Sequence, residues 1–353
     1  GAGAPGAAGR AAAEESAPLN AVGAEEHSRL EDGAVLTPTG FQDAYEAFVT
    51  SGRPAVAFPD QYGGGGMPGI VATAVNELVT TANMAFSLCP MLTYGAVDML
   101  LEHGSDEHRQ QWLDVLVSGS WAGTMVLTEA DAGSDVGALT TKAIPQDDGS
   151  YRITGSKIYI TWGDHDLTDN IVHIVLARTP DAPPGTKGIS CFIVPKFIRN
   201  DDGSVGEFNN VETVSLEHKL GIHASPTAVL AFDDSVGYLI GEENKGMRYM
   251  FTMMNNARLQ VGLQGVSVAE RAYQGAVEYS LERKQGRAIG APKTEKSLIV
   301  EHPDVRRMLM LMRSQIEAAR CLVFKTAEYI DVSREHPDEA ARARATERLA
   351  LFT

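Results

Sequence analysis

Cysteine is scarce in this 353-residue sequence, and positive charge is in deficit. The three cysteines, Cys89, Cys191 and Cys321, are odd in number and far apart, so we expect no disulfide framework and a reducing, cytoplasmic location. Lys and Arg total 30 against 46 Asp and Glu, which gives a formal net charge of −16. Because an acidic surface repels phosphate backbones, we expect no nucleic-acid partner.

Long apolar runs are missing as well. The longest stretch without a charged residue, 78–97, contains polar residues and Pro90, which favours buried helices over a membrane span. Residues 1–13 are rich in Gly and Ala and lack the apolar core of a signal peptide, so we expect a frayed, low-complexity start. The nine histidines include no paired spacing that suits a metal, and the Asp-His-Asp sequence at 164–166 consists of adjacent residues that point apart. No metal site is expected.

Hydrophobic periodicity divides the chain into three regions. Apolar residues recur at helical spacing in residues 1–122, short β-branched strands separated by turns fill residues 123–241, and helical spacing returns in residues 242–353. No segment of helical length separates the strands, which favours an antiparallel sheet over a parallel doubly wound one. The sequence therefore predicts an α+β fold with an N-terminal helical domain, a central antiparallel β-barrel or sandwich, and a C-terminal helical bundle that is incomplete.

Two strand-like segments carry the clearest chemistry. Residues 125–137, Met-Val-Leu-Thr-Glu-Ala-Asp-Ala-Gly-Ser-Asp-Val-Gly, read as an apolar strand that ends in short hydroxyls and in glycines that let a ligand approach the backbone. Residues 157–161, Lys-Ile-Tyr-Ile-Thr, read as a strand with an aromatic side chain and a terminal hydroxyl. Two such strand ends suit a planar ring with acceptor atoms along its edge, such as a flavin. Composition alone favours the alternative, two ordinary strands of a β domain.

The order of these segments resembles that of the acyl-CoA dehydrogenase family over nearly the whole chain. Residues 125–137 resemble the family's flavin- and substrate-binding signature, and residues 157–161 resemble its second flavin strand. Further matches follow in the same order at 217–232, 239–241, 246–247, 255–258 and 279–285. Within the family, the chain most resembles the large methylmercaptopropionyl-CoA dehydrogenases and the broad-range fatty acyl-CoA dehydrogenases.

The resemblance implies a set of residues that bind FAD. Thr128 and Thr161 would donate hydrogen bonds to the flavin ring, and Gly133 and Ser134 would lie beside the pyrophosphate and the pantetheine of the substrate. The ring would be lined by Met125, Leu127, Tyr159 and Ile160. Trp162 stands where a small polar residue is usual in the family. We expect it either to crowd the edge of the flavin or to pack in the core.

Polar residues near the C-terminal helices complete the implied site. Arg283 and Gln285 would reach the FAD of a neighbouring subunit in a homodimer or homotetramer, because a guanidinium pairs well with phosphate oxygens. Asn255 and Arg258 would lie on the substrate side together with Ser134. The alternatives are a solvent-facing arginine at 283 and a structural ion pair at 258.

The same resemblance implies a reaction and its partners. A carboxylate would remove the α-proton of an acyl-CoA thioester while the β-hydride passes to the flavin, which gives a trans-2-enoyl-CoA. An electron-transfer flavoprotein would then take the electrons. The expected substrate is a fatty acyl-CoA or 3-methylmercaptopropionyl-CoA, as in fatty-acid or dimethylsulfoniopropionate metabolism.

The catalytic base has no match in the sequence. Most members of the family carry a glutamate in a Gly-rich stretch near the end of the C-terminal bundle, and this stretch is expected beyond Thr353. A minority carry the glutamate on the long helix, at the position of Ala257. A truncated chain is therefore the favoured interpretation. The alternatives are a non-catalytic relative that binds flavin or acyl-CoA, and a flavin oxidase that acts on a non-CoA substrate.

Overall fold

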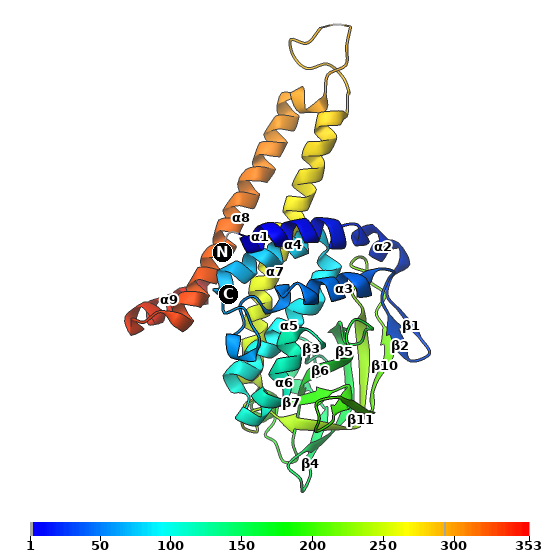
Figure 1. The fold of residues 1–353 in the computed structure, drawn as a ribbon, viewed down its shortest axis with the longest axis vertical. Coiled ribbons are helices and arrows are strands. Elements are labelled where there is room, and N and C mark those ends of the chain that lie inside the picture. The colour runs from blue at the N-terminus through cyan, green and yellow to red at the C-terminus, as the bar shows by residue number, and fades with distance from the viewer. Residues whose placement is uncertain (1–2, 293, 353) are drawn as a thin grey trace. The chain divides into compact units, whose positions relative to one another are not determined.

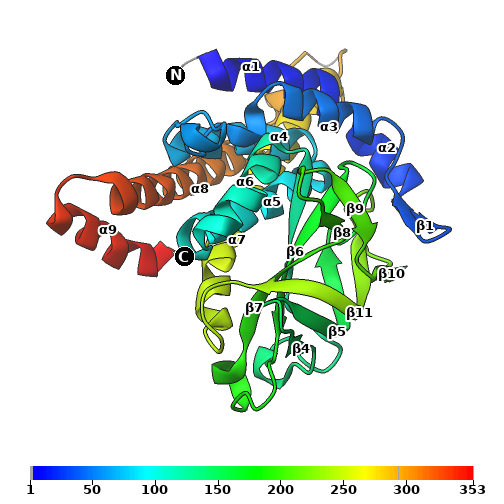
Figure 2. The same ribbon diagram turned by 60° about the horizontal axis from the view of Figure 1, so that its bottom comes forward.

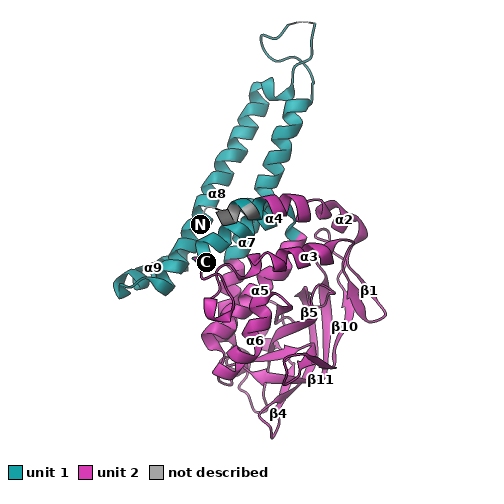
Figure 3. Ribbon diagram, in the orientation of Figure 1, with its two compact units in different colours: residues 1–9, 68–84, 259–353 teal, residues 10–67, 85–258 magenta. Residues whose placement is uncertain are grey.

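The computed structural model describes residues 3–292 and 294–352, in which helices and strands combine in the predicted α+β fold (Figure 1). Contacts group the chain into two compact units, each discontinuous in sequence (Figure 3). Unit 1 comprises Gly1–Gly9, Pro68–Met84 and Leu259–Thr353, and unit 2 comprises Arg10–Met67 and Ala85–Arg258. The domain boundaries after residues 122 and 241, which follow changes of periodicity along the chain, stay a prediction.

Most strands of unit 2 form one curled sheet. In chain order they are β3 (Trp121–Val126), β4 (Lys142–Pro145), β5 (Tyr151–Thr161), β6 (Asn170–Ala177), β7 (Ser190–Pro195), β10 (Val211–Leu216) and β11 (Thr227–Leu239). Their spatial order is β3-β6-β7-β11-β5-β4, with β10 paired to β11. Figure 1 labels β3, and Figure 2 labels the other strands of this sheet. Two small hairpins lie outside this sheet and consist of β1 (Arg29–Glu31) with β2 (Ala34–Leu36), and β8 (Phe197–Arg199) with β9 (Val205–Phe208).

Backbone hydrogen bonds join strands that are far apart in this order. The N–H of Ile158 on β5 donates to the carbonyl of Thr128 just beyond β3 (2.9 Å). The N–H of Ala143 on β4 donates to the carbonyl of Arg178 just beyond β6 (2.8 Å). The sheet therefore curls back on itself in the way that a barrel requires.

One strand pair differs from the predicted antiparallel arrangement. β3 and β6 run parallel, with Trp121 opposite Asn170 and Val126 opposite Val175, whereas the other pairs of this sheet are antiparallel. Two further strands, β4 and β5, lie between β3 and β6 in the chain, and such a long connection allows two strands to run in the same direction. Alternation of side chains shows that a strand exists but not its direction.

Unit 2 also contains helices. They are α2 (Leu19–Glu26), α3 (Phe41–Thr50), α5 (Met84–His103, in this unit from Ala85), α6 (Asp106–Ser118) and the first part of α7 (Gly246–Glu282). Met99 of α5, Trp112 of α6 and Met250 of α7 pack in one cluster with Ile174 of β6, and all four are fully buried. In the described part of the chain, α5 is the one helix long and apolar enough to cross a membrane, and 78% of its most apolar window is buried.

Unit 1 is helical. It contains the first residues of α1 (Gly3–Ala11), α4 (Gly69–Ala82), the rest of α7, α8 (Pro303–Glu335) and α9 (Glu339–Phe352). Both ends of α4 are capped by charged side chains of other helices. Asp331 of α8 accepts hydrogen bonds from the N–H groups of Gly69 (2.8 Å) and of the next residue (3.0 Å). Arg271 of α7 donates to the carbonyls of Thr81 (3.2 Å) and Ala82. The signs of these charges complement the helix dipole.

Residues 3–16 are helical, whereas the sequence led us to expect fraying over residues 1–13, of which residues 1 and 2 lie outside the described residues. The fraying stays a prediction. α1 begins at Gly3 and is followed by a short π-helix over Ala12–Ser16. Alanine has the highest intrinsic helix propensity, and tertiary contacts supply the rest of the stability of a short helix. Ala8 and Ala12 are buried, so this low-complexity segment does have packing partners.

Arg320 of α8 binds carboxylates from two other helices. Its Nε donates to Glu77 Oε1 of α4 (2.7 Å), and its Nη2 donates to Glu270 Oε2 of α7 (2.8 Å). The side chains of Glu77 and Glu270 are only 12% and 16% exposed. Burial raises the pKa of Glu270, but hydrogen bonds from Arg320 and Gln274 outweigh it and lower the pKa overall.

We expect Arg320→Met to lower the free energy of unfolding by about 2 kcal/mol, because two largely buried carboxylates lose their shared counterion. Urea unfolding followed by the helical circular dichroism signal measures this. Arg313→Met on the same helix is the matched control, since the ion pair of Arg313 with Glu317 is 57% and 43% exposed. Its loss should cost under about 0.5 kcal/mol. Equal losses in both variants would contradict a special role for Arg320.

Candidate functional site

The two segments predicted to bind a flavin lie side by side in unit 2. The backbone hydrogen bond between Ile158 and Thr128 joins the residues just beyond β3 to the C-terminal half of β5. Opposite Val229 of β11, β5 has two residues instead of one, and the second, Tyr159, has φ of +60°. This β-bulge redirects the side chain of Tyr159, which is 60% exposed.

Short hydroxyls at these strand ends are available to a ligand. Within residues 3–292 and 294–352, no hydrogen bond involves the side-chain oxygens of Thr128, Ser134 and Thr161. Thr128 and Thr161 are half-buried, and Ser134 is exposed. Gly133 is exposed too, and a Cβ built on it would meet only Thr128 Cγ2, at 3.5 Å.

This set of residues fits a flavin chemically. Half-buried hydroxyls can donate to acceptor atoms along the edge of a ring. The neighbouring Met125 and Leu127 are half-buried apolar side chains that offer an apolar surface at the same place, whereas Ile160 is buried in the core of the sheet. Such an arrangement would suit a planar ligand with acceptor atoms along its edge.

Glu129 and Lys157 form a buried ion pair at this place, which the sequence analysis did not single out. Lys157 Nζ lies 2.9 Å from Glu129 Oε1, and their side chains are 0% and 8% exposed. Burial raises the pKa of Glu129, but the Lys157 ammonium and the hydrogen bonds from Thr141 and Thr140 lower it to about 2. Burial lowers the pKa of Lys157 to about 8, and Glu129 limits that shift. Both groups are thus charged at neutral pH. Alternation along β5 could have revealed Lys157, because it lies on the face of the buried Ile153.

Trp162 packs in the core, which decides between its two expected positions. Its side chain is 1% exposed, and its Nε1 donates to the carbonyl of Ala85 at the start of α5 (3.1 Å). Trp162 has φ of +51°, so the backbone turns directly after Thr161. The indole therefore anchors the end of β5 to α5.

The predicted residues near the C-terminal helices form two local pairs. Arg258 Nη1 donates to Asn255 Oδ1 (2.9 Å), and its guanidinium lies 5.6 Å from the centre of the Phe251 ring. Arg283 Nη2 donates to Gln285 Oε1 (3.3 Å), and both side chains are exposed. The first pair belongs to unit 2 and the second to unit 1. Their roles toward substrate and FAD stay predictions.

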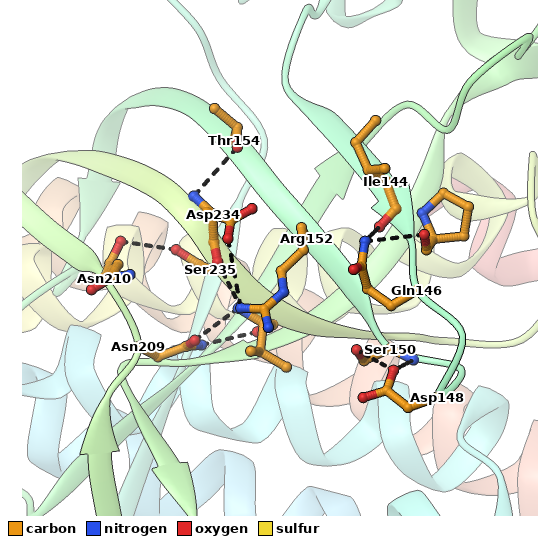
Figure 4. Close-up of polar contacts among 12 residues, drawn as sticks. Ile144, Gln146, Asp148, Ser150, Arg152, Thr154, Asn209, Asn210, Asp234 and Ser235 are labelled. Atoms are coloured by element: carbon orange, nitrogen blue, oxygen red, sulfur yellow. Dashed lines mark hydrogen bonds and ion pairs between the residues drawn. The ribbon is translucent and has the colours of Figure 1, made fainter.

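A second polar cluster surrounds the beginning of β5 (Figure 4). Asp148 accepts from the N–H (2.9 Å) and the hydroxyl (2.7 Å) of Ser150, which closes the turn between β4 and β5. Arg152 donates to the carbonyl of Asp234 (3.2 Å), and Thr154 accepts from the N–H of Asp234 (3.3 Å). These contacts close turns and join strands, so the cluster is structural.

Disulfide bonds and metal sites were also sought among the described residues. All three cysteines are unpaired. Among residues 3–292 and 294–352, no group of three His, Cys, Asp or Glu side chains is arranged to hold a metal ion.

The chain matches three domain families that together cover most of its length. They are the acyl-CoA dehydrogenase N-terminal domain (residues 10–120), middle domain (124–235) and C-terminal domain (244–350). It is 50% identical over 337 residues to a 3-methylmercaptopropionyl-CoA dehydrogenase of Ruegeria pomeroyi, which covers 96% of this chain but 57% of that relative. It is 34% identical over 300 residues to a short-chain-specific acyl-CoA dehydrogenase of Clostridium acetobutylicum, over 83% of this chain and 72% of that relative.

Solved structures show the same architecture. Butyryl-CoA dehydrogenase from Megasphaera elsdenii superposes with a TM-score of 0.77 at 26% identity, over 99% of this chain and 84% of that one. An acyl-CoA dehydrogenase from Bacillus anthracis complexed with FAD gives a TM-score of 0.72 at 24% identity, over 89% and 52%. The chain spans about half the length of several curated relatives that it matches.

Proposed function

This chain belongs to the acyl-CoA dehydrogenase family, and from this premise we propose that it binds FAD at the ends of β3 and β5 and takes part in the α,β-dehydrogenation of an acyl-CoA thioester. The observation that carries the proposal is the hydrogen bond between Ile158 and Thr128, which brings the two strand ends together. The hydroxyls of Thr128 and Thr161, which have no partner among the described residues, add to it.

The residues of this site would bind and orient the ring. Thr128 and Thr161 would donate hydrogen bonds to its edge, and Gly133 and Ser134 would let phosphate and pantetheine groups approach the backbone. Apolar side chains would exclude water from the ring, namely those of Met125, Leu127, Tyr159 and Ile160. When bound, FAD supplies the redox chemistry of the family.

The base that removes the α-proton is not assigned to a described residue. Ala257 stands at one of the two family positions and cannot accept a proton. Glu270 lies further along α7, but its carboxylate is bound by Arg320 and Gln274. Its lowered pKa makes it a poor base.

Substrate and partners are proposed from the family. A 3-methylmercaptopropionyl-CoA or a fatty acyl-CoA is the proposed substrate, and an electron-transfer flavoprotein the proposed electron acceptor. Homo-oligomerisation is supported by large apolar side chains that are exposed on α7 and α8 of unit 1. They are Val261, Val268, Tyr279, Leu281, Met308, Met310, Leu311 and Leu322. Residence in the cytoplasm stays a prediction.

We expect Thr128→Val and Thr161→Val each to weaken FAD binding about 5- to 10-fold, which corresponds to one lost hydrogen bond of roughly 1 kcal/mol. Titration of the flavin-free chain with FAD, followed by flavin absorbance, measures this. Thr154→Val is the matched control, because it makes the same change at the other end of β5, near Arg152 (Figure 4).

FAD uptake and flavin reduction by the unsubstituted protein test the proposed function itself. Uptake of FAD, followed by anaerobic bleaching with an acyl-CoA, would support a dehydrogenase. Bleaching only by a non-CoA substrate would favour a related oxidase. FAD uptake without bleaching by any acyl-CoA would favour a binding protein without a base. A folded protein that takes up no FAD would contradict the proposal.

A further inference from the structure

The ion pair of Glu129 and Lys157 lies directly beside the residue proposed to bind the flavin edge. Lys157 Nζ donates to the carbonyl of Leu127 (2.8 Å) as well as to Glu129 Oε1 (2.9 Å). These two acceptors belong to the residues immediately before and after Thr128. The carbonyl of Thr128 itself accepts from the N–H of Ile158 (2.9 Å), the residue that follows Lys157. Three successive residues beyond β3 are thus tied to two successive residues of β5.

The carboxylate of Glu129 also fixes the chain beyond it. Its Oε2 accepts from the N–H (2.7 Å) and hydroxyl (2.8 Å) of Thr140. Its Oε1 accepts from the N–H (3.0 Å) and hydroxyl (2.5 Å) of Thr141. The backbone of Glu129 exchanges two hydrogen bonds with Ala132, both 3.1 Å. The segment that carries Gly133 and Ser134 is therefore held at its start by the backbone of Glu129 and at its end by the carboxylate of the same residue.

The stability of the fold alone does not explain why Glu129 and Lys157 are charged residues. Taking an ammonium and a carboxylate out of water costs free energy that their attraction repays only in part, and a well-packed apolar pair is often as stable. Hydrogen-bonded charges do, however, fix geometry more tightly than apolar contacts, because each bond has a preferred distance and direction. Groups that hold a binding residue from behind commonly govern the affinity of the site.

We propose that Glu129 and Lys157 are positioning residues of the flavin site: their ion pair holds the Thr128 hydroxyl and the end of β5 in the relative position that the ring requires. This inference rests on the proposed function. Neither side chain contacts the flavin in this role, since both are buried behind the strand ends.

The test is the double variant Glu129→Gln/Lys157→Met, which keeps the volume of both side chains and removes both charges. We expect it to fold and to bind FAD about 10- to 100-fold more weakly than the unsubstituted protein, by absorbance titration below its unfolding temperature. Arg320→Met is the control, because it breaks a partly buried ion pair in unit 1. It should lower stability and leave the affinity for FAD unchanged.

A coupling measurement separates positioning from a merely structural role. In the double-variant background, Thr128→Val should weaken FAD binding less than about 2-fold, because the hydroxyl is no longer held in place. If the double variant does not fold, Thr140→Val replaces it. That change removes one donor to Glu129 at an exposed residue, and FAD affinity should fall about 3-fold.

The outcomes distinguish the two proposals. The positioning role would be overturned if the double variant Glu129→Gln/Lys157→Met bound FAD as tightly as the unsubstituted protein and Thr128→Val kept its full effect in that background. FAD uptake by the unsubstituted protein would then leave the proposed function intact. If Thr140→Val is the variant used, unchanged affinity overturns the positioning role. No uptake by the folded, unsubstituted protein would overturn both.

Discussion

Between pH 7.5 and pH 5, unit 2 is expected to lose about 4 kcal/mol of its free energy of unfolding through two buried histidines. His165 and His173 are 5% and 0% exposed. Burial, and then the charge of Lys196, lower the pKa of each to about 3. Nδ1 of His165 accepts from the N–H of Leu167 (3.2 Å), so protonation there would also break a hydrogen bond.

The sign follows from the direction of these shifts. Unfolded histidine titrates near pH 6.5, whereas these two stay neutral in the folded chain down to about pH 3. Their stabilisation is fully present above pH 6.5 and is lost as the pH falls toward 3, by about 1.4 kcal/mol per unit for each. Burial also lowers the pKa of His103 and of His108, which adds to the loss in the same direction. Glu129 contributes only below about pH 4.5.

Urea unfolding at several pH values, followed by tryptophan fluorescence, measures this loss. The probe is specific because Trp112, Trp121 and Trp162 all belong to unit 2. In His173→Gln, the dependence of the free energy of unfolding on pH between 6.5 and 5 should fall by about 1.1 kcal/mol per unit, whatever the variant's stability at pH 7.5. An unchanged pH dependence would show that His173 is not held neutral.

The second large effect concerns the charges of Glu129 and Lys157. We expect Lys157→Met alone to lower the free energy of unfolding of unit 2 by about 3 to 5 kcal/mol, because it leaves a carboxylate buried without its cation. Glu129→Gln alone should cost a similar amount, since it leaves the ammonium of a side chain with 0% exposure. The double variant should lie within about 1.5 kcal/mol of the unsubstituted protein, because both charges are gone and the volumes are kept.

Tryptophan fluorescence in urea at pH 7.5 again reports the result. The informative quantity is the difference between the double variant and the sum of the two single variants. The 2.9 Å contact between Lys157 Nζ and Glu129 Oε1 predicts strongly non-additive losses of the free energy of unfolding. Additive losses would contradict this coupling. The double variant should therefore have nearly the stability of the unsubstituted protein but a lower affinity for FAD.

The fold class could be predicted from the sequence because it depends on local patterns. Changes of hydrophobic period predicted helices, then strands, then helices, and the structure confirms this α+β order. Composition alone favoured two ordinary strands at residues 125–137 and 157–161, and the resemblance to the family indicated a flavin there. The structure joins these two segments at Thr128 and Ile158.

The sequence by itself determined the succession of helical, strand-rich and helical regions, since propensity and periodicity are properties of neighbours along the chain. Only the tertiary structure decided that β3 runs parallel to β6, that Trp162 packs against α5 and that Glu129 is the partner of the Lys157 ammonium. Each of these depends on residues brought together from distant parts of the chain. Whether a charge or an indole is buried is decided by the partner that it meets there, and no local pattern names that partner.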